Sequence, residues 1–422
     1  MDSRSFPTAI LAPLAAAGIL ASVTARGGSP RSASRQPVVT GPFGASDPVT
    51  LPPRTAYHGV MTTERLSVGL LFGGESPEHE VSIVTARSIA ANLDPDRYAV
   101  RPMGIARNGV WVMNGDPLAR LAAGELPERG DHPFLPLERG AEDVALPDVF
   151  FNAIHGAGGE DGQIQGFLEP LHRPYTGAGL LAMAAALDKW ITKRIWESDG
   201  LPVVPYRGLT EEGWRRAPEA VLRSLEPLGL PVFVKPANLG SSIGIEKVRR
   251  AGDLAAALDR AFGFDRRVVV EQGLRARELE VAVLGGDDPF VSVPGEILVA
   301  GEFYDFKDKY INGKSSARIP ADLPEGLGNL IKRYAVDAFR ALDAYGMARV
   351  DFFLDRDTGR LFLNEINLIP GFTSISMYPK LMEASGIPYR ELLTRLIDLA
   401  LLRHQEKIAK TRFFQSGSRW YA

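Results

Sequence analysis

The chain has 422 residues, of which 45% are hydrophobic and 23% charged, and its formal net charge is -3. This length supports two or three domains with full cores, and the composition is ordinary for a globular protein. The charge excludes a strongly basic nucleic-acid surface, which normally needs an excess of Lys and Arg. The absence of cysteine excludes disulfides, thiolate zinc sites and a cysteine nucleophile. It also fits a reducing compartment, so we expect a cytoplasmic protein that binds neither nucleic acid nor membranes.

Residues 1–60 differ from the rest of the chain. They are rich in Ser, Pro, Gly, Ala and Arg, and they show no helical or strand period, which predicts disorder. The apolar run Thr8–Thr24 is short for a membrane span, and Asp2 beside Arg4 leaves no net positive charge before it. Three interpretations stay open: a disordered or non-native extension with a start at Met61, a disordered targeting tail, and a secretion signal.

Strands and helices alternate from residue 66 onward. We predict strands at Leu66–Gly73, Tyr98–Ile105 and Val149–Ile154, with a helix over roughly Glu78–Asn92 after the first of them. This alternation predicts a doubly wound parallel α/β domain. The ligand-binding edge of such a sheet lies at the carboxyl ends of its strands, where His155 follows the last strand.

The remaining two thirds of the chain mix strands and helices in a different order. The predicted helices are about 189–199, 253–262 and 389–402. The predicted strands are 231–234, 244–248, 268–271, 279–284, 348–354 and 361–366. There is no internal repeat and no coiled-coil heptad run.

A Gly/Ser loop follows one of these strands. Lys235 ends the strand, and Gly240, Ser241, Ser242 and Gly244 come next in the segment KPANLGSSIG. Backbone N–H groups and hydroxyls in such a loop can contact phosphate oxygens. The loop is neither the mononucleotide phosphate loop nor the dinucleotide fingerprint. Taken alone, such a loop is more often an ordinary turn than a phosphate site.

A carboxylate-rich hairpin is predicted near the C-terminus. Arg349 and Asp351 are two residues apart on one strand and so share a face, as do Glu365 and Asn367 on the next. A turn through Arg356–Gly359 would bring the two pairs together. Two carboxylates and an amide oxygen suit Mg²⁺. The alternative is a solvated strand face, which the apolar neighbours make less attractive because buried carboxylates need a partner.

A third element leads from an apolar strand into a turn. Glu271, Gln272 and Leu274 lie at its end, where a free backbone edge could recognise adenine, and Glu278 could hold ribose hydroxyls. By itself this segment is hardly distinguishable from any other strand and turn.

Together and in this order, these elements resemble the ATP-grasp superfamily, and more closely the D-alanine–D-alanine ligases, from Leu66 to about Ala400. The resemblance rests on LFGGESPEHEVS, HGAGGEDGQIQG, YTGAG, LDK, VKPANLGSSIG, FYDFKDKY, ARVDFF and NEINLIPGFTSISMYP. It implies an ATP-grasp fold: an N-terminal doubly wound parallel α/β domain and two α+β subdomains that sandwich ATP. The implied boundaries are an extension at 1–60, the α/β domain at 61–188, a central subdomain at 189–278, a C-terminal subdomain at 279–410, and a tail at 411–422.

The resemblance also implies an ATP and metal site. The phosphates are implied to contact Lys189 and Lys235, with the loop residues Gly240, Ser241 and Ser242. Adenine and ribose are implied to bind Glu271, Gln272, Leu274 and Glu278. Two Mg²⁺ ions, with Mn²⁺ as an alternative, are implied to bind Asp351, Glu365 and Asn367.

Substrate positions follow from the same resemblance. Glu80 is implied to hold the amino group of a first D-alanine and His155 to lie near its carboxylate, while Ser376 and Lys309 anchor the carboxylate of a second. Arg349 and the backbone N–H of Gly371 are implied to stabilise the tetrahedral intermediate. Tyr310 and Ser241, with Glu80, would close a lid at 304–316. Without the family, Glu80 is equally a first-turn acid, His155 a strand-end cap, and Tyr310 and Lys309 surface residues.

The implied activity is ATP-dependent ligation of two D-alanine molecules through a D-alanyl phosphate, for peptidoglycan precursor synthesis, by a homodimer. One alternative is another ATP-grasp ligase, which should lack the GGESPEHEVS and FYDFKDKY segments. A dehydrogenase is disfavoured because no dinucleotide fingerprint follows Leu66–Gly73. An inactive homologue is disfavoured because every expected catalytic position is occupied.

Overall fold

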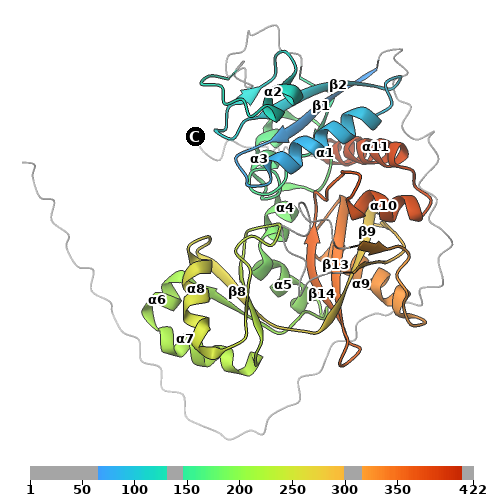
Figure 1. Ribbon diagram of the computed structural model, residues 1–422. Coiled ribbons are helices and arrows are strands. Elements are labelled where there is room, and N and C mark those ends of the chain that lie inside the picture. Colours follow the sequence, from blue (N-terminus) through green and yellow to red (C-terminus); the bar gives the residue numbers. More distant parts are fainter. Residues whose placement is uncertain (1–64, 131–145, 299–315, 411–422) are drawn as a thin grey trace, which may run out of the picture. The chain divides into compact units, whose positions relative to one another are not determined.

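The computed structural model describes residues 65–130, 146–298 and 316–410, which belong to one compact unit, Arg54–Ala422. They contain three β-sheets with their helices (Figure 1). Residues 1–60, Lys309, Tyr310 and the tail at 411–422 lie outside the described residues, as does nearly all of the predicted lid. Within the described ranges, no helix is long and apolar enough to cross a membrane.

The first sheet is mainly parallel, as predicted. Its order is β3-β2-β1-β4, and β1 pairs in parallel with both β2 and β4, while the short β3 is an antiparallel edge strand. The strands are β1 (Leu66–Gly73), β2 (Tyr98–Ile105), β3 (Trp111–Val112) and β4 (Val149–Asn152). Nearly every residue of β1 is buried, which is typical of a parallel strand covered on both faces.

Helices from both ends of the chain cover this sheet. On one face, Leu70 and Phe72 pack in the core that includes α1 (His79–Asn92), α2 (Pro117–Ala122) and α11 (Tyr389–Ile408). On the other face, Leu71 packs with α3 (Gln163–Leu168). Figure 1 shows α11 beside α1, although almost three hundred residues of chain separate them. The last described helix of the chain therefore covers part of one face of the first sheet.

The second sheet is antiparallel, with the order β5-β8-β6-β7. Its strands are β5 (Tyr206–Thr210), β6 (Val232–Pro236), β7 (Glu246–Val248) and β8 (Arg267–Gln272). One face is covered by α6 (Glu211–Arg216), α7 (Pro218–Leu225) and α8 (Leu254–Phe262). On the other face, Ala237 and Val269 pack with Trp190 of α5 (Lys189–Ser198). This arrangement places α5 directly behind β6 and β8.

The third sheet carries the predicted carboxylate hairpin. Its order is β12-β11-β9-β13-β14, with β10 paired to β9. The strands are β9 (Ala276–Gly285), β10 (Phe290–Val291), β11 (Gly295–Leu298), β12 (Ser316–Arg318), β13 (Gly346–Asp355) and β14 (Leu361–Asn367). Arg349 pairs with Asn367 and Asp351 with Glu365, so the predicted meeting of the two pairs is confirmed.

The remaining helices connect or cover these sheets. They are α4 (Leu180–Leu187), α9 (Leu327–Ala341) and α10 (Met377–Ala384), with short 3-10 turns at Glu169–Leu171, Glu226–Leu228 and Ala251–Asp253. The indole of Trp196 on α5 donates to the carbonyl of Ala338 on α9 at 3.2 Å. Helix α5 therefore contacts both the second sheet and the elements of the third. The three sheets lie at 66–152, 206–272 and 276–367, whereas the predicted domain boundaries themselves stay a prediction.

Candidate active site

Two neighbouring cavities collect the predicted site residues. The first has a volume of about 140 Å³ and lies between β6 and β8 of the second sheet and β9, β13 and β14 of the third. Its predicted members are Lys235, Ser242, Glu271, Gln272, Leu274, Glu278, Asp351 and Glu365. The second, of about 110 Å³, holds His155, Gly240, Ser241, Arg349, Glu365, Asn367, Gly371 and Ser376. Glu365 lines both, so the two cavities meet at β14.

Lys235 ends in the first cavity as part of a buried charge cluster. Its Nζ donates to Glu271 Oε2 at 2.7 Å, and Lys193 Nζ lies 3.1 Å from Glu271 Oε1. Burial alone would raise the pKa of Glu271, but the charges and hydrogen bonds of the two lysines outweigh it and lower that pKa to about 2. The Glu271 carboxylate is thus already held by lysines, and its predicted place on the adenine side is untested.

Lys189 lies at the start of α5 and contacts the Gly/Ser loop. Its Nζ donates to the carbonyl of Leu239 at 2.5 Å, and its backbone N–H donates to Ala237 at 3.0 Å. It lines a small third cavity of about 30 Å³ together with Gly240 and Glu365. Burial lowers the pKa of Lys189, and the charge of Glu365 partly offsets this. Both predicted phosphate lysines therefore lie beside the loop or the first cavity.

The loop between β6 and β7 has a strained backbone. Ser241 and Ser242 have φ values of 50° and 59°, a left-handed conformation that is uncommon for residues other than glycine. Asn238 holds the start of the loop, because its backbone and side-chain N–H groups both donate to Asp265 at 2.8 Å. Ser241 Oγ donates to Glu78 Oε1, so the tip of the loop reaches the first domain.

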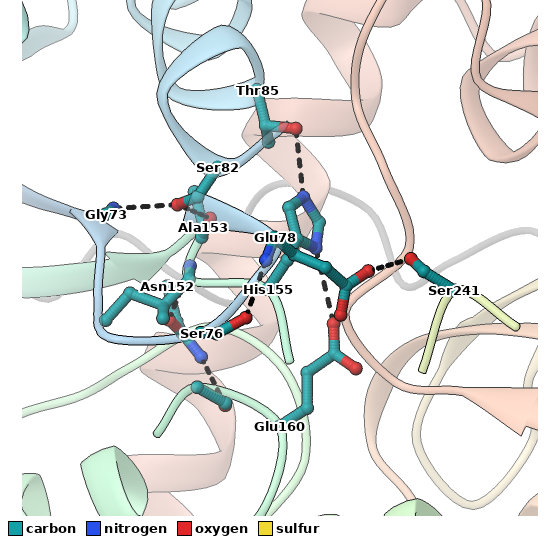
Figure 2. Close-up of polar contacts among 12 residues, drawn as sticks. Gly73, Ser76, Glu78, Ser82, Thr85, Asn152, Ala153, His155, Glu160 and Ser241 are labelled. Atoms are coloured by element: carbon teal, nitrogen blue, oxygen red, sulfur yellow. Dashed lines mark hydrogen bonds and ion pairs between the residues drawn. The ribbon is translucent and has the colours of Figure 1, made fainter. Parts of the chain in front are cut away.

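The structure does not bring Glu80 into either main cavity, and its role stays a prediction. Glu80 is exposed and pairs with Arg107, whereas Glu78 is buried, lines the second cavity and accepts from Ser241. Glu78 is the N-cap residue of α1 and Glu80 lies in its first turn, so the two side chains leave the helix in different directions. Figure 2 shows the Glu78 carboxyl group beside His155 and bonded to Ser241. The structure therefore brings Glu78, and not Glu80, beside Ser241 in the second cavity.

His155 is held by contacts to both ring nitrogens (Figure 2). Thr85 Oγ1 lies 2.9 Å from Nε2, and Glu160 Oε1 lies 3.3 Å from Nδ1. Burial alone would lower the pKa of His155, but the hydrogen bond and charge of Glu160 and the charge of Glu78 raise it above its usual value. The imidazolium form therefore persists to higher pH than in a free histidine, and this form suits a nearby anion such as a carboxylate.

Buried side chains position the loops that carry Glu78 and His155. Ser82 Oγ donates to the carbonyl of Ala153 at 2.6 Å and accepts from the backbone N–H of Gly73 at 2.8 Å. Asn152 Nδ2 donates to the carbonyl of Gly159 at 3.0 Å. These bonds tie the carboxyl ends of β1 and β4 together, which is the predicted ligand edge of the first sheet.

Arg349 lies at the centre of an acidic cluster in the second cavity. Its Nε and Nη2 donate to the two oxygens of Asp351 at 2.7 and 2.6 Å, and Nε lies 3.2 Å from Glu280 Oε2. Burial, together with the charges of Glu280 and Glu365, raises the pKa of Asp351 to about 8 despite Arg349. Three carboxylates thus face one guanidinium.

This cluster is the predicted metal site. Among the described residues, no three His, Cys, Asp or Glu side chains already converge around one point as metal ligands. The donor chemistry nevertheless fits a hard divalent cation: carboxylates of Asp351 and Glu365 stand beside the Asn367 amide. The raised pKa of Asp351 marks an excess of buried negative charge, which a cation would relieve.

The loop after β14 completes the second cavity. Ser376 Oγ accepts from the backbone N–H of Thr373 at 3.0 Å and lies 2.8 Å from Thr373 Oγ1. A Cβ at Gly371 would come within 2.7 Å of Ser376 Oγ. Glycine at this position therefore lets the backbone approach the serine closely.

Four charged residues of the site were not predicted: Glu78, Glu160, Glu280 and Lys193. Each carried a signal. Lys193 is four residues after Lys189 and so shares a helix face with it, and Glu280 shares a strand face with Glu278. Glu78 and Glu160 lie inside the motifs GGESPEHEVS and HGAGGEDG. A cavity of about 300 Å³ beside Tyr175 and Arg403 contains none of the predicted residues.

Comparisons with known proteins identify the family of the chain. Residues 67–178 match the family model described as the D-ala D-ala ligase N-terminus, and residues 195–398 match that of the C-terminus. The D-alanine--D-alanine ligase of Heliobacterium modesticaldum is 45% identical over 351 residues, covering 81% of this chain and 96% of that protein. That of Prosthecochloris aestuarii is 46% identical, covering 81% and 99%.

Solved structures show the same similarity. The D-alanine-D-alanine ligase from Coxiella burnetii has a TM-score of 0.70 and 36% identity, covering 82% of this chain and 97% of its own. The VanG D-Ala:D-Ser ligase from Enterococcus faecalis has a TM-score of 0.66 and 29% identity, covering 80% and 100%. The fold is thus the expected ATP-grasp fold. The match extends over both family models and nearly the whole length of these relatives, and the chain therefore belongs to the D-alanine–D-alanine ligase family.

Proposed function

We propose that this protein joins two D-alanine molecules with ATP, forming D-alanyl-D-alanine, ADP and phosphate for peptidoglycan precursor synthesis. The observation that carries the proposal is the second cavity, which combines Glu78, His155 and Arg349. An amino acid brings one positive and one negative group, and a buried acid beside a histidine with a raised pKa complements both. The first cavity adjoins it at Glu365, so a nucleotide there would present its terminal phosphate to the amino acid.

The reaction needs activation because a carboxylate does not acylate an amine at neutral pH. We propose that an oxygen of the first D-alanine carboxylate attacks the γ-phosphorus of ATP. The bond from that phosphorus to the β,γ-bridging oxygen breaks, giving ADP and D-alanyl phosphate. The uncharged amine of the second D-alanine then attacks the carbonyl carbon. The tetrahedral oxyanion collapses by breaking the carbon–oxygen bond to phosphate, and the proton of the attacking amine leaves with that phosphate.

The residues of the first cavity would hold the nucleotide. We assign the phosphate contacts to Lys189, Lys235 and the backbone of the loop at Gly240–Ser242, because phosphoryl transfer depends mainly on positioning and charge neutralisation. Asp351, Glu365 and Asn367 would hold two Mg²⁺ or Mn²⁺ ions, which neutralise phosphate charge. Gln272, Leu274 and Glu278 are assigned to adenine and ribose, since they line the same cavity.

The residues of the second cavity would hold the amino acids. We assign Glu78 to the amino group of the first D-alanine, His155 to the region of its carboxylate, and Ser376 to the carboxylate of the second. Arg349 and the Gly371 N–H would stabilise the oxyanion, as donors aimed at developing charge do elsewhere. Lys309 and Tyr310 are retained as lid residues that exclude water from the acyl phosphate; they lie outside the described residues.

Phosphate release with single amino acids tests this proposal. Release should require D-alanine together with ATP and Mg²⁺, and mass spectrometry should find D-alanyl-D-alanine as the product. L-alanine is the matched control, and D-serine or D-lactate offered with D-alanine tests the second position, where we expect the dipeptide to dominate at neutral pH. Phosphate release that responds to another amino acid but not to D-alanine would refute D-alanine as the substrate. It would still be consistent with an ATP-dependent ligase. A homodimer in the cytoplasm, where ATP is available, remains part of the proposal.

A further inference from the structure

Lys193 is a buried lysine to which the proposed reaction gives no role. It lies on α5, only 1% exposed, and it does not line either of the two main cavities. Its Nζ is 3.1 Å from Glu271 Oε1 and 3.4 Å from the carbonyl oxygen of Asn364. A buried ammonium is costly unless its partners compensate for lost hydration. Such a group in the core behind a proposed nucleotide site calls for an explanation.

The two partners of Lys193 belong to different sheets. Glu271 is on β8 of the second sheet and carries Lys235 on its other oxygen, at 2.7 Å. Asn364 is on β14 of the third sheet, immediately before Glu365. One ammonium group therefore joins the strand whose acid orients Lys235 to the strand that carries a proposed metal ligand. These are the two sides of the first cavity.

We infer that Lys193 is a positioning residue for the nucleotide: it holds Glu271, and through Glu271 it sets Lys235 against the phosphates. The inference deepens the proposed function and rests on it. With Lys193 in place, each oxygen of Glu271 has an ammonium group as its ion-pair partner. Without it, one oxygen is released, and Lys235 can follow the freed carboxylate away from the cavity.

The test is equilibrium binding of ADP and of ATP with Mg²⁺, without any amino acid, to Lys193→Met. Methionine keeps an unbranched chain of similar length and removes the charge. We expect dissociation constants to rise about 10- to 100-fold, in the range of coupling between contacting charged groups. Because no D-alanine is present in the binding step, a failed substrate assignment would leave this result intact.

A double-mutant cycle separates positioning from general damage. Glu271→Gln should weaken binding by itself, and Lys193→Met should add less than about twofold in that background. The double variant also leaves no unpaired buried acid, so it stays foldable if Lys193→Met alone does not. The matched control is Trp196→Phe, which removes the α5 bond to Ala338 and leaves the Glu271 cluster alone; its nucleotide binding should be normal.

Three outcomes would overturn the inference: unchanged nucleotide binding by a folded Lys193→Met protein, additive effects in the cycle, or an equal loss in Trp196→Phe. A wild-type protein that binds no ATP would remove both the inference and the proposed function. Normal nucleotide binding without D-alanine ligation in the wild type would contradict the proposed function alone.

Discussion

Glu78 and Glu80 are separated by one residue, yet only Glu78 lines the second cavity. Successive helical residues turn by about 100°, so two acids spaced this way cannot both face the same ligand. We expect Glu78→Gln to reduce kcat/KM for D-alanine about 100-fold, because a buried charge partner of the substrate is lost. The matched Glu80→Gln variant should stay within about twofold. Initial rates over a range of D-alanine concentrations decide between the two acids. A larger loss of kcat/KM in Glu80→Gln than in Glu78→Gln would favour Glu80 as the substrate-binding acid.

Glu365 lines both main cavities. We expect Glu365→Ala to lower ATP turnover at least about 100-fold while the protein stays folded, because charge neutralisation is lost where phosphoryl transfer develops charge. Phosphate release at ordinary Mg²⁺ concentration measures the effect, and a thermal melt verifies the fold. Near-normal turnover by a folded variant is incompatible with the metal assignment.

Glu160 controls the charge of His155. Its hydrogen bond and charge help raise the pKa of His155, so the imidazolium persists to higher pH in the wild type than it would without Glu160. Affinity that depends on the imidazolium is present below the folded pKa and is lost as pH rises through it. In Glu160→Gln, we expect the KM for D-alanine to begin rising at lower pH than in the wild type. Identical KM profiles between pH 6 and 9 would show that His155 does not act by charge.

The strand ends of the first sheet work as a scaffold for the site. Ser82, which is fully buried, bonds to both Gly73, the last residue of β1, and Ala153, which follows β4. We expect Ser82→Ala to cost about 1–3 kcal/mol of unfolding free energy, because two buried backbone groups lose their partner. The KM for D-alanine should rise as well. Denaturant unfolding gives the cost, and Ser224→Ala, an exposed serine that bonds only within its own helix, is the control.

The elements that the sequence predicted well are those with a strong hydrophobic signal. The bounds of β1 and β2 agree with prediction, because continuous apolar runs bounded by turn residues leave little freedom. The pairing of β13 with β14 followed from one turn and the two-residue period. By contrast, β12 is exposed at all three residues, so no hydrophobic pattern marks it. Helix α9, which was not predicted, does place Ile331, Ala335 and Ala338 on one buried face.

The sequence predicted the motifs that form the site better than it predicted which residue of each motif faces the cavity. The motif GGESPEHEVS pointed to an acid at the start of α1, but only the direction of each side chain from the helix separates Glu78 from Glu80. Likewise, Lys193 had the helical spacing of a partner for Lys189, yet its pairing with Glu271 depends on how α5 packs behind β8. Contacts between elements distant in sequence decide such cases.

At the scale of the whole chain, the family match begins at residue 67. We expect a protein lacking residues 1–60 to keep the wild-type kcat and a melting temperature within about 2 °C, since the predicted composition offers little apolar surface for docking. Parallel activity assays and thermal melts of the two forms check this. A loss of several degrees, or of activity, would show that the segment contributes to the folded domain.

Helix α11 also has a consequence for how the protein is made. It packs against α1 and β4, Tyr389 bonds to Ser88, and its residues Leu392, Leu393 and Leu396 are completely buried. A ribosome releases the strands of the first sheet long before it releases residues 389–408. During that interval, part of the apolar face of the sheet has no native cover. The nascent chain must therefore carry exposed β-strand surface through most of its own translation, a period in which chaperone binding competes with aggregation.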